Sequence, residues 1–319
     1  MMDYDVFNGD ADGLCALQQL RLAEPCGATL VTGVKRDIRL LDRVRAEAGD
    51  VLTVLDVSLD SNRKGLERAL EAGARVCWFD HHFAGDIPAH ANLEAHIDTA
   101  PEVCTSALVD RHLGGRFRRW AVVAAFGDNL PALGRRLALE CGLDEAQTAA
   151  AARLGELLNY NAYGESIADL HFDPAALALR LREAADPFAF IRDSDVFARL
   201  SVGHDEDMAR AARIRPERIG AHGIVLLLPD ETWARRVSGP LANEWARAHP
   251  DRALAVLSPN TRGNLTVSVR APVARPQGAD TLCRGYPSGG GRKAAAGIND
   301  LPPAEYERFC AAFEAHFAA

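Results

Sequence analysis

The sequence has no long apolar run, no paired cysteines and no recognisable targeting segment. No apolar stretch approaches the roughly 20 residues that a membrane-spanning helix needs, so we expect no membrane anchor. The seven cysteines are scattered and form no CxxC pair, which indicates reduced, mostly structural thiols. The N-terminus carries neither a basic region nor an apolar signal core, so we expect a cytoplasmic protein.

The charge of the chain is unevenly distributed. The net charge of −8 argues against a protein that coats long nucleic acids, yet residues 1–209 carry 21 Lys+Arg against 34 Asp+Glu and residues 210–319 carry 15 against 10. An acidic half that holds cations and a basic half that holds anions would explain this difference. Two unevenly charged, solvated surfaces would explain it equally well.

The length of 319 residues exceeds what one hydrophobic core usually serves. Apolar runs at 3–7, 28–33, 50–58 and 75–80 alternate with helix-like segments at 13–24, 38–49 and 61–73, which is typical of βαβ units. Residues 104–218 look largely helical, and β-rich runs return at 223–229, 252–259 and 264–272. We predict an α/β fold, with an N-terminal, mainly parallel βαβ sheet domain and helical middle segment (1–210) and a smaller C-terminal α/β domain (211–319).

Acidic and histidine side chains follow the predicted strands of the N-terminal sheet. They are Asp10 and Asp12 in a turn after the first strand, Asp56 in the third, and Asp80, His81 and His82 closing the fourth. In open α/β sheets, ligands bind at the carboxyl ends of the strands. An isolated Asp-x-Asp turn or His-His pair is usually structural, so the prediction of a functional site depends on their convergence at one edge.

Carboxylates gathered at one sheet edge need a positive charge among them. A pair about 4 Å apart costs on the order of 4 kcal/mol at an effective dielectric of about 20. Mixed carboxylate and imidazole ligands suit Mn²⁺ or a similar ion better than Ca²⁺. Two Mn²⁺ or Mg²⁺ ions bridged by one carboxylate could activate water and stabilise both the attacking and the leaving oxygen at phosphorus.

Four motifs, NGDADG at 8–13, VLDVS at 54–58, WFDHH at 78–82 and GDN at 127–129, resemble in order and spacing those of the DHH phosphoesterase superfamily. That superfamily includes RecJ-type exonucleases, oligoribonucleases, cyclic-dinucleotide phosphodiesterases and family II inorganic pyrophosphatases. The resemblance implies that Asp10 and Asp56 hold one metal ion, with Asp56 as the bridge. It assigns the second ion to Asp12, Asp56, His81 and Asp128.

The same resemblance implies roles for the neighbouring residues. His82 would face the substrate phosphate, and Asp80 would orient the histidines. Many relatives place a metal-binding histidine four residues before the first motif aspartate, where this chain has Val6. RecJ-like members lack that histidine, and Asn8 stands where they carry an acidic residue, so the chain is more similar to them.

The segment from Tyr286 to Gly297 combines three consecutive glycines with basic and small residues. Consecutive glycines can turn successive backbone N–H groups into one anion-binding concavity. The segment resembles the GGGHxxAAG signature of the DHH-associated C-terminal domain, with Arg292 in place of its histidine, and 267–270 resembles that domain's substrate-facing strand. The predicted phosphate-binding residues, in a cleft between the domains, are Arg270, Gly289, Gly290, Gly291, Arg292 and Lys293.

Residues 158–165 contain Tyr160 and Tyr163 among turn-forming residues. These tyrosines could stack on a base, but a loop packed by its own tyrosines is the interpretation we favour.

We therefore predict a two-metal phosphoesterase that hydrolyses a phosphodiester in short oligonucleotides or nucleotides. Two alternatives remain open: a hydrolase of pyrophosphate or polyphosphate, and a nucleotide-binding module that has lost catalysis, which Val6 and Arg292 suggest. The partners we expect are small phosphorylated substrates, with neither long DNA nor membrane among them, and a homodimer is left open.

Overall fold

The computed structural model describes residues 1–318, and the chain folds as two compact units. The first unit contains residues 1–162 and 166–201, and the second contains residues 163–165 and the chain from Val202 onward. The division falls within a helix, and the predicted boundary at residue 210 lies at the end of that helix. No helix within residues 1–318 combines the length and apolar character needed to cross a bilayer.

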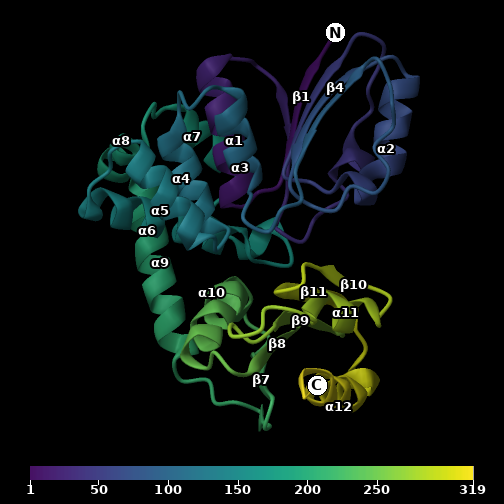
Figure 1. Ribbon diagram of the computed structural model, residues 1–319, viewed down its shortest axis with the longest axis vertical. Helices are drawn as coiled ribbons and strands as arrows, with labels where there is room; N and C mark the ends of the chain where they lie inside the picture. Colours follow the sequence, from purple (N-terminus) through teal and green to yellow (C-terminus); the bar gives the residue numbers. More distant parts are fainter. Residues whose placement is uncertain (319) are drawn as a thin grey trace. The chain divides into compact units, whose positions relative to one another are not determined.

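The sheet of the first unit is parallel throughout, as the alternating pattern predicts (Figure 1). Its strand order is β2-β1-β3-β4-β5, and each neighbouring pair is in parallel register. The strands are β1 (Asp3–Phe7), β2 (Thr29–Val31), β3 (Val51–Leu55), β4 (Arg75–Asp80) and β5 (Leu93–Ile97). All five strands therefore end at one edge of the sheet. Strand β5, which includes the exposed Glu94 and the half-buried His96, was not among the strands expected from the sequence.

Helices cover both faces of this sheet (Figure 1). On one face, α1 (Ala11–Ala23) packs with the helical middle segment around Phe7, Leu55 and Phe79. On the other, α2 (Leu59–Glu71) covers Val6, Val54 and Trp78. Two apolar clusters thus hold the sheet rigidly between layers of helix.

The helix predicted over 38–49 is wrong. Only a single 3-10 turn forms there, η1 (Leu40–Arg43), and the rest is loop. The side chain of Asn62 on α2 accepts a hydrogen bond from the Leu41 N–H at 3.1 Å and donates to the Ile38 carbonyl at 2.6 Å. These bonds hold the chain in a turn against α2, where Leu40 and Leu41 are buried.

The middle of the chain is helical, as predicted. Its elements are α3 (Thr105–His112), α4 (Arg118–Gly127), α5 (Pro131–Glu140), α6 (Glu145–Ala162), η2 (Ile167–Asp169), α7 (Pro174–Arg182), α8 (Pro187–Asp193) and α9 (Asp195–Ala211). Where α4 meets α6, a Cβ on Gly155 would lie 2.2 Å from the Val123 carbonyl oxygen. This close approach positions the end of α4, and therefore the residue that follows Gly127.

The second unit contains a mixed sheet in the order β10-β11-β9-β8-β7-β6, in which only β7 and β8 are parallel. Its elements are β6 (Arg218–Ile219), β7 (Gly223–Leu227), α10 (Thr232–Ala248), β8 (Ala253–Pro259), β9 (Leu265–Arg270), α11 (Ala279–Arg284), β10 (Gly289–Gly291), β11 (Ala295–Leu301), η3 (Pro303–Glu305) and α12 (Tyr306–Phe317). Together the two units confirm the predicted fold class.

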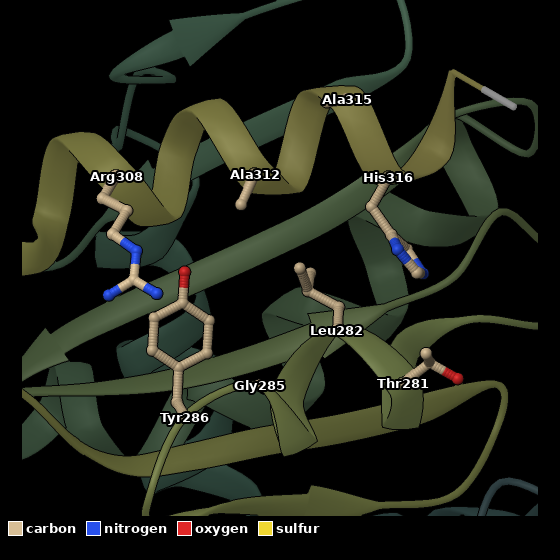
Figure 2. A pocket seen from close by; sticks show the side chains of 8 residues that line it. All are labelled: Thr281, Leu282, Gly285, Tyr286, Arg308, Ala312, Ala315 and His316. Carbon is tan, nitrogen blue, oxygen red and sulfur yellow. The ribbon is translucent and has the colours of Figure 1, made fainter.

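An open groove of about 430 Å³ lies between α11 and α12 in the second unit, and Figure 2 shows the side chains that line it. Tyr286 and Arg308 lie at one end, where the guanidinium carbon is 5.8 Å from the centre of the tyrosine ring, and His316 lies at the other. None of the predicted site residues lines this groove, so it is not part of the candidate site.

Candidate metal centre

The edge where the parallel strands end brings five of the predicted site residues together. Asp12 lies in the first turn of α1, Asp56 follows β3, His81 and His82 follow β4, and Asp128 is the C-cap of α4. Two groups among them place ligand atoms within 4.8 Å of one another: Asp12, His81 and Asp128 in one, and Asp56, His81 and His82 in the other. His81 belongs to both and is the centre of the arrangement.

The imidazole of His81 is held in one orientation. Its Nδ1 lies 2.7 Å from the carbonyl oxygen of Val103, so Nδ1–H donates to that carbonyl and Nε2 faces the carboxylates. Nε2 is 3.4 Å from Asp56 Oδ1, 3.8 Å from Asp12 Oδ2 and 3.9 Å from Asp128 Oδ2. A backbone carbonyl that fixes the ring from behind is the usual support of a metal-binding histidine.

The N-terminus of α3 holds two of the carboxylates. The backbone N–H groups of Thr105 and Ser106 each donate to an oxygen of Asp12 at 2.7 Å. The hydroxyl of Thr105 donates to Asp56 Oδ1 at 3.0 Å. Both carboxylates are at most 2% exposed, so the positive end of the helix partly offsets the cost of burying their charges.

Asp56 has a backbone conformation that is uncommon for residues other than glycine, with φ of 57°. Its N–H donates to the Phe79 carbonyl of β4 at 3.0 Å, which ties the end of β3 to the neighbouring strand. Non-glycine residues in this region cluster at functional sites, where the surrounding structure supports the strain.

The buried charges shift one another's pKa values. Burial raises the pKa of Asp12 well above its usual value, and the charge of Asp56 adds to the effect. Burial alone would lower the pKa of His81, but the hydrogen bond with Asp56 and the charges of the carboxylates raise it to about 10. Burial would raise the pKa of Asp56, but hydrogen bonding to His81 and the charges of both histidines lower it below its usual range. Without an ion, this cluster therefore holds a proton on His81.

The donor set fits a divalent cation. Three carboxylates, of which Asp12 and Asp56 are buried, surround an imidazole nitrogen whose opposite side is fixed, which is the mixed oxygen and nitrogen set that Mn²⁺ accepts. A bound ion would replace the proton on His81. The side chains that would hold the ion are Asp12, Asp56, His81 and Asp128.

His82 and Asp80 form a separate pair beside this centre. The Asp80 Oδ1 and His82 Nδ1 atoms are 2.7 Å apart, so Asp80 orients the second histidine. Asp80 is fully buried, and its Oδ2 accepts no hydrogen bond from any residue in the range 1–318. The side chain of His82 is 36% exposed. Of the two histidines, His82 is therefore the one whose ring solvent or a ligand can reach.

Asp10 has different partners from the other carboxylates. It caps α1, and its Oδ1 accepts the N–H groups of Asp12 and Gly13 at 3.0 and 3.2 Å. Its Oδ2 forms an ion pair with the ammonium of Lys35, which also donates to Asn159 Oδ1 at 3.1 Å. Among residues 1–318, Asp10 belongs to neither group of metal-ligand atoms at this edge.

Lys35, Asn159 and Thr105 were not among the site residues expected from the sequence. Lys35 and Thr105 lie outside the quoted motifs and carry no pattern that would mark them. Asn8, a candidate, uses its amide within the turn: Oδ1 accepts the Asp10 N–H at 3.2 Å, and Nδ2 donates to the Lys35 carbonyl at 3.3 Å.

The predicted phosphate-binding residues lie in the second unit, on the sheet. The three glycines form the edge strand β10, paired with β11, instead of the expected open loop. Arg292 and Lys293 are exposed at the turn that follows, where the Arg292 N–H donates to the Ala295 carbonyl at 2.8 Å. Arg270 Nε donates to Asn243 Oδ1 at 3.0 Å. Phosphate binding by these residues stays a prediction.

The two tyrosines of the 158–165 segment are packed inside the protein. Tyr160 is fully buried in α6 and its hydroxyl is 2.8 Å from His171 Nε2. Tyr163 is 9% exposed and lies against Gly239 of α10. Packing, the interpretation favoured above, agrees with these positions, but most of the segment is helix and not loop.

A third group of ligand atoms lies on the strands β4 and β5, where Cys77, Glu94 and His96 come within 4.8 Å of one another. His96 Nε2 is 2.7 Å from Glu94 Oε1, and its ring stacks on Phe79 with centroids 4.3 Å apart. The Glu94 side chain is 64% exposed. This group shares no residue with the centre around His81, but an added metal ion could also bind there.

The chain has the two-domain fold of a group of nucleases and phosphodiesterases. The Mn²⁺ complex of RecJ from Thermus thermophilus matches 99% of this chain with a TM-score of 0.58 and 21% identity. A manganese-bound exonuclease RecJ matches 99% with a TM-score of 0.55 and 20% identity. The pGpG-specific phosphodiesterase PggH from Vibrio cholerae matches 100% with a TM-score of 0.57 and 16% identity.

These matches differ in how much of each known protein they cover. This chain spans about half, 52%, of the Thermus RecJ chain, but 90% of the second RecJ and 99% of PggH. No protein-family model matches the sequence, and no curated protein matches it. At these identities the likeness shows the fold, and this fold is the one that the resemblance to the DHH superfamily led us to expect.

Proposed function

We propose that the chain is a metal-dependent phosphoesterase of the DHH superfamily that hydrolyses a phosphodiester in a short oligonucleotide or nucleotide. The observation that carries this proposal is His81 Nε2 facing three carboxylates at 3.4 to 3.9 Å, with its ring fixed by Val103. The fold shared with RecJ and PggH supports it.

A Mn²⁺ or Mg²⁺ ion held at this centre would supply positive charge to polarise a phosphate and to favour ionisation of water. The chain's own residues supply the rest. Asp12 and Asp56 are held in place by the N-terminus of α3, and His82 is held by Asp80 through Nδ1. The role that we propose for the partly exposed His82 ring, when both of its nitrogens are protonated, is to donate a proton or a hydrogen bond from Nε2 to a phosphate oxygen.

The second unit supplies the proposed phosphate contacts through Arg270, Arg292 and Lys293. Arg292 and Lys293 are exposed, so their charges are accessible to a ligand. An arginine can bind phosphate through a bidentate fork, but it cannot exchange a proton near neutral pH. Its proposed role is therefore substrate binding, and Arg292→Ala should raise KM more than it lowers kcat.

The proposal is tested by incubating the purified protein with pGpG, other dinucleotides, short RNA, a chromogenic phosphodiester and pyrophosphate, each with Mn²⁺, Mg²⁺ or Co²⁺. We expect a dinucleotide or short oligonucleotide to be cleaved, and activity to be lost with EDTA or Asp56→Asn. Asp86→Asn is the matched control, because Asp86 is exposed and lies outside the centre. Release of phosphate from pyrophosphate alone would favour the phosphoanhydride alternative. Nucleotide binding without turnover of any substrate would favour the alternative of a nucleotide-binding module that has lost catalysis.

A further inference from the structure

Lys35 is a basic residue that contacts Asp10 beside the candidate metal centre. Its N–H donates to the Ala162 carbonyl at 2.9 Å, and its own carbonyl accepts Asn8 Nδ2 at 3.3 Å. Its ammonium contacts Asp10 Oδ2 and Asn159 Oδ1. Its side chain is 26% exposed and that of Asp10 3%. The lysine is therefore anchored at its backbone and at its charged end.

The Lys35 ammonium pairs with the Asp10 oxygen that a second divalent ion would need as a ligand. One oxygen of Asp10 is already engaged by two N–H groups of α1, so Oδ2 is the oxygen left for a cation, and Lys35 pairs with it. The strand position four residues before Asp10 offers no replacement ligand, because Val6 is fully buried in the apolar cluster beneath α2. A divalent ion beside Asp10 would lie next to a fixed positive charge and would be repelled.

We propose that Lys35 is a built-in cation that replaces the second metal ion, so that the centre takes one divalent ion, held by Asp12, Asp56, His81 and Asp128. This inference rests on the proposed metal-dependent function and revises the number of ions expected from the sequence. Lys35 then provides one fixed positive charge beside Asp10, whereas a second divalent ion would provide two positive charges there.

The test is the number of Mn²⁺ ions bound per chain, measured by equilibrium dialysis with elemental analysis, together with the electron paramagnetic resonance spectrum. All proteins carry Cys77→Ser, so that an ion bound with Glu94 and His96 is disfavoured. The spectra distinguish two ions in one centre from two ions at separate sites, because ions about 3.5–4 Å apart are magnetically coupled, whereas ions at distant sites are not. The variants are Lys35→Met, which keeps the length of the side chain without its charge, and Lys35→Gln, which can still donate to Asp10.

The matched control is Lys64→Met, because Lys64 is exposed on α2. We expect about one uncoupled ion per chain in the parent and in Lys64→Met, and about two coupled ions in Lys35→Met or Lys35→Gln. A purely structural lysine would change the melting temperature of the protein without changing the number of ions.

Three results overturn the inference, and they can be told apart. Two coupled ions in the parent would show that Lys35 does not exclude the second ion, while the proposed function stands. One ion in the parent and in both folded variants would show that something other than Lys35 sets the number. No ion in the parent would remove the metal-dependent function and this inference with it.

Discussion

The affinity of the centre for a divalent ion should depend steeply on pH, because the ion must displace the proton of His81. The three carboxylates raise the pKa of this imidazole to about 10, so it is protonated at neutral pH when no ion is bound. A pH of 7 is about three units below that pKa. Displacing the proton at this pH therefore costs about 4 kcal/mol, at about 1.36 kcal/mol per unit. The affinity should therefore rise about tenfold per pH unit between pH 6 and pH 8.5.

The raised pKa of Asp12 acts in the same direction, since a carboxyl that binds a proton more tightly also competes better with the ion. Asp56, with its lowered pKa, adds no proton to be displaced. The number of protons released on binding should thus be at least about one at pH 7.

Isothermal titration calorimetry with Mn²⁺ and Mg²⁺ measures both quantities, if each pH is repeated in two buffers of different ionisation enthalpy. His81→Gln should bind the ion more weakly and with a flatter pH dependence. His222→Gln, which changes an exposed histidine of the second unit, should behave as the parent does. Affinity that is independent of pH, with no proton released, would refute the assignment of Nε2 as a ligand that is protonated in the absence of metal.

Three further predictions concern residues that support the centre. Thr105→Val removes the hydroxyl bond to Asp56 and should weaken Mn²⁺ binding about 10- to 100-fold in calorimetry, whereas an unchanged affinity would contradict the support given to Asp56. Asp80→Asn should lower kcat at least about tenfold while the Mn²⁺ affinity stays unchanged, since the Asp80 carboxylate pairs with His82 and with no residue of the group around His81; a parallel loss of affinity would mean that it supports the ion as well. Gly155→Ala should lower the free energy of unfolding by about 1–3 kcal/mol in thermal melts, because its methyl group would clash with α4, and equal stability would show that the helices can separate.

The parallel sheet, and the approach of most candidate site residues at one of its edges, could be predicted because they depend on local patterns. Asp56 and the Asp-His-His run each follow an apolar strand, and parallel strands end at one edge, so their approach follows from the alternation of strands and helices. Asp128 was assigned by resemblance alone. It caps α4, and no periodicity in the helical region shows that this helix ends beside the sheet.

The features that could not be predicted depend on partners far away in the sequence. Lys35 is a single lysine in a loop, and only the folded chain brings it to Asp10 and Asn159. The support of Asp12 comes from backbone N–H groups of α3, which no residue type signals. The helical pattern at 38–49 gave way to contacts with Asn62. The glycine strand, by contrast, depends on a local pairing: the three glycines pair with residues 296–298, and a run of glycines does not itself indicate a strand.

The backbone of Asp56 restricts which amino acids this position can accept. With φ of 57°, glycine and asparagine would fit the turn about as easily as aspartate, while β-branched residues would be strained. Neither glycine nor asparagine offers the negative charge that the ion and His81 require. In a library of all twenty residues at this position, selection for folding alone would retain a small set of sequences, and selection for activity would reduce that set to aspartate.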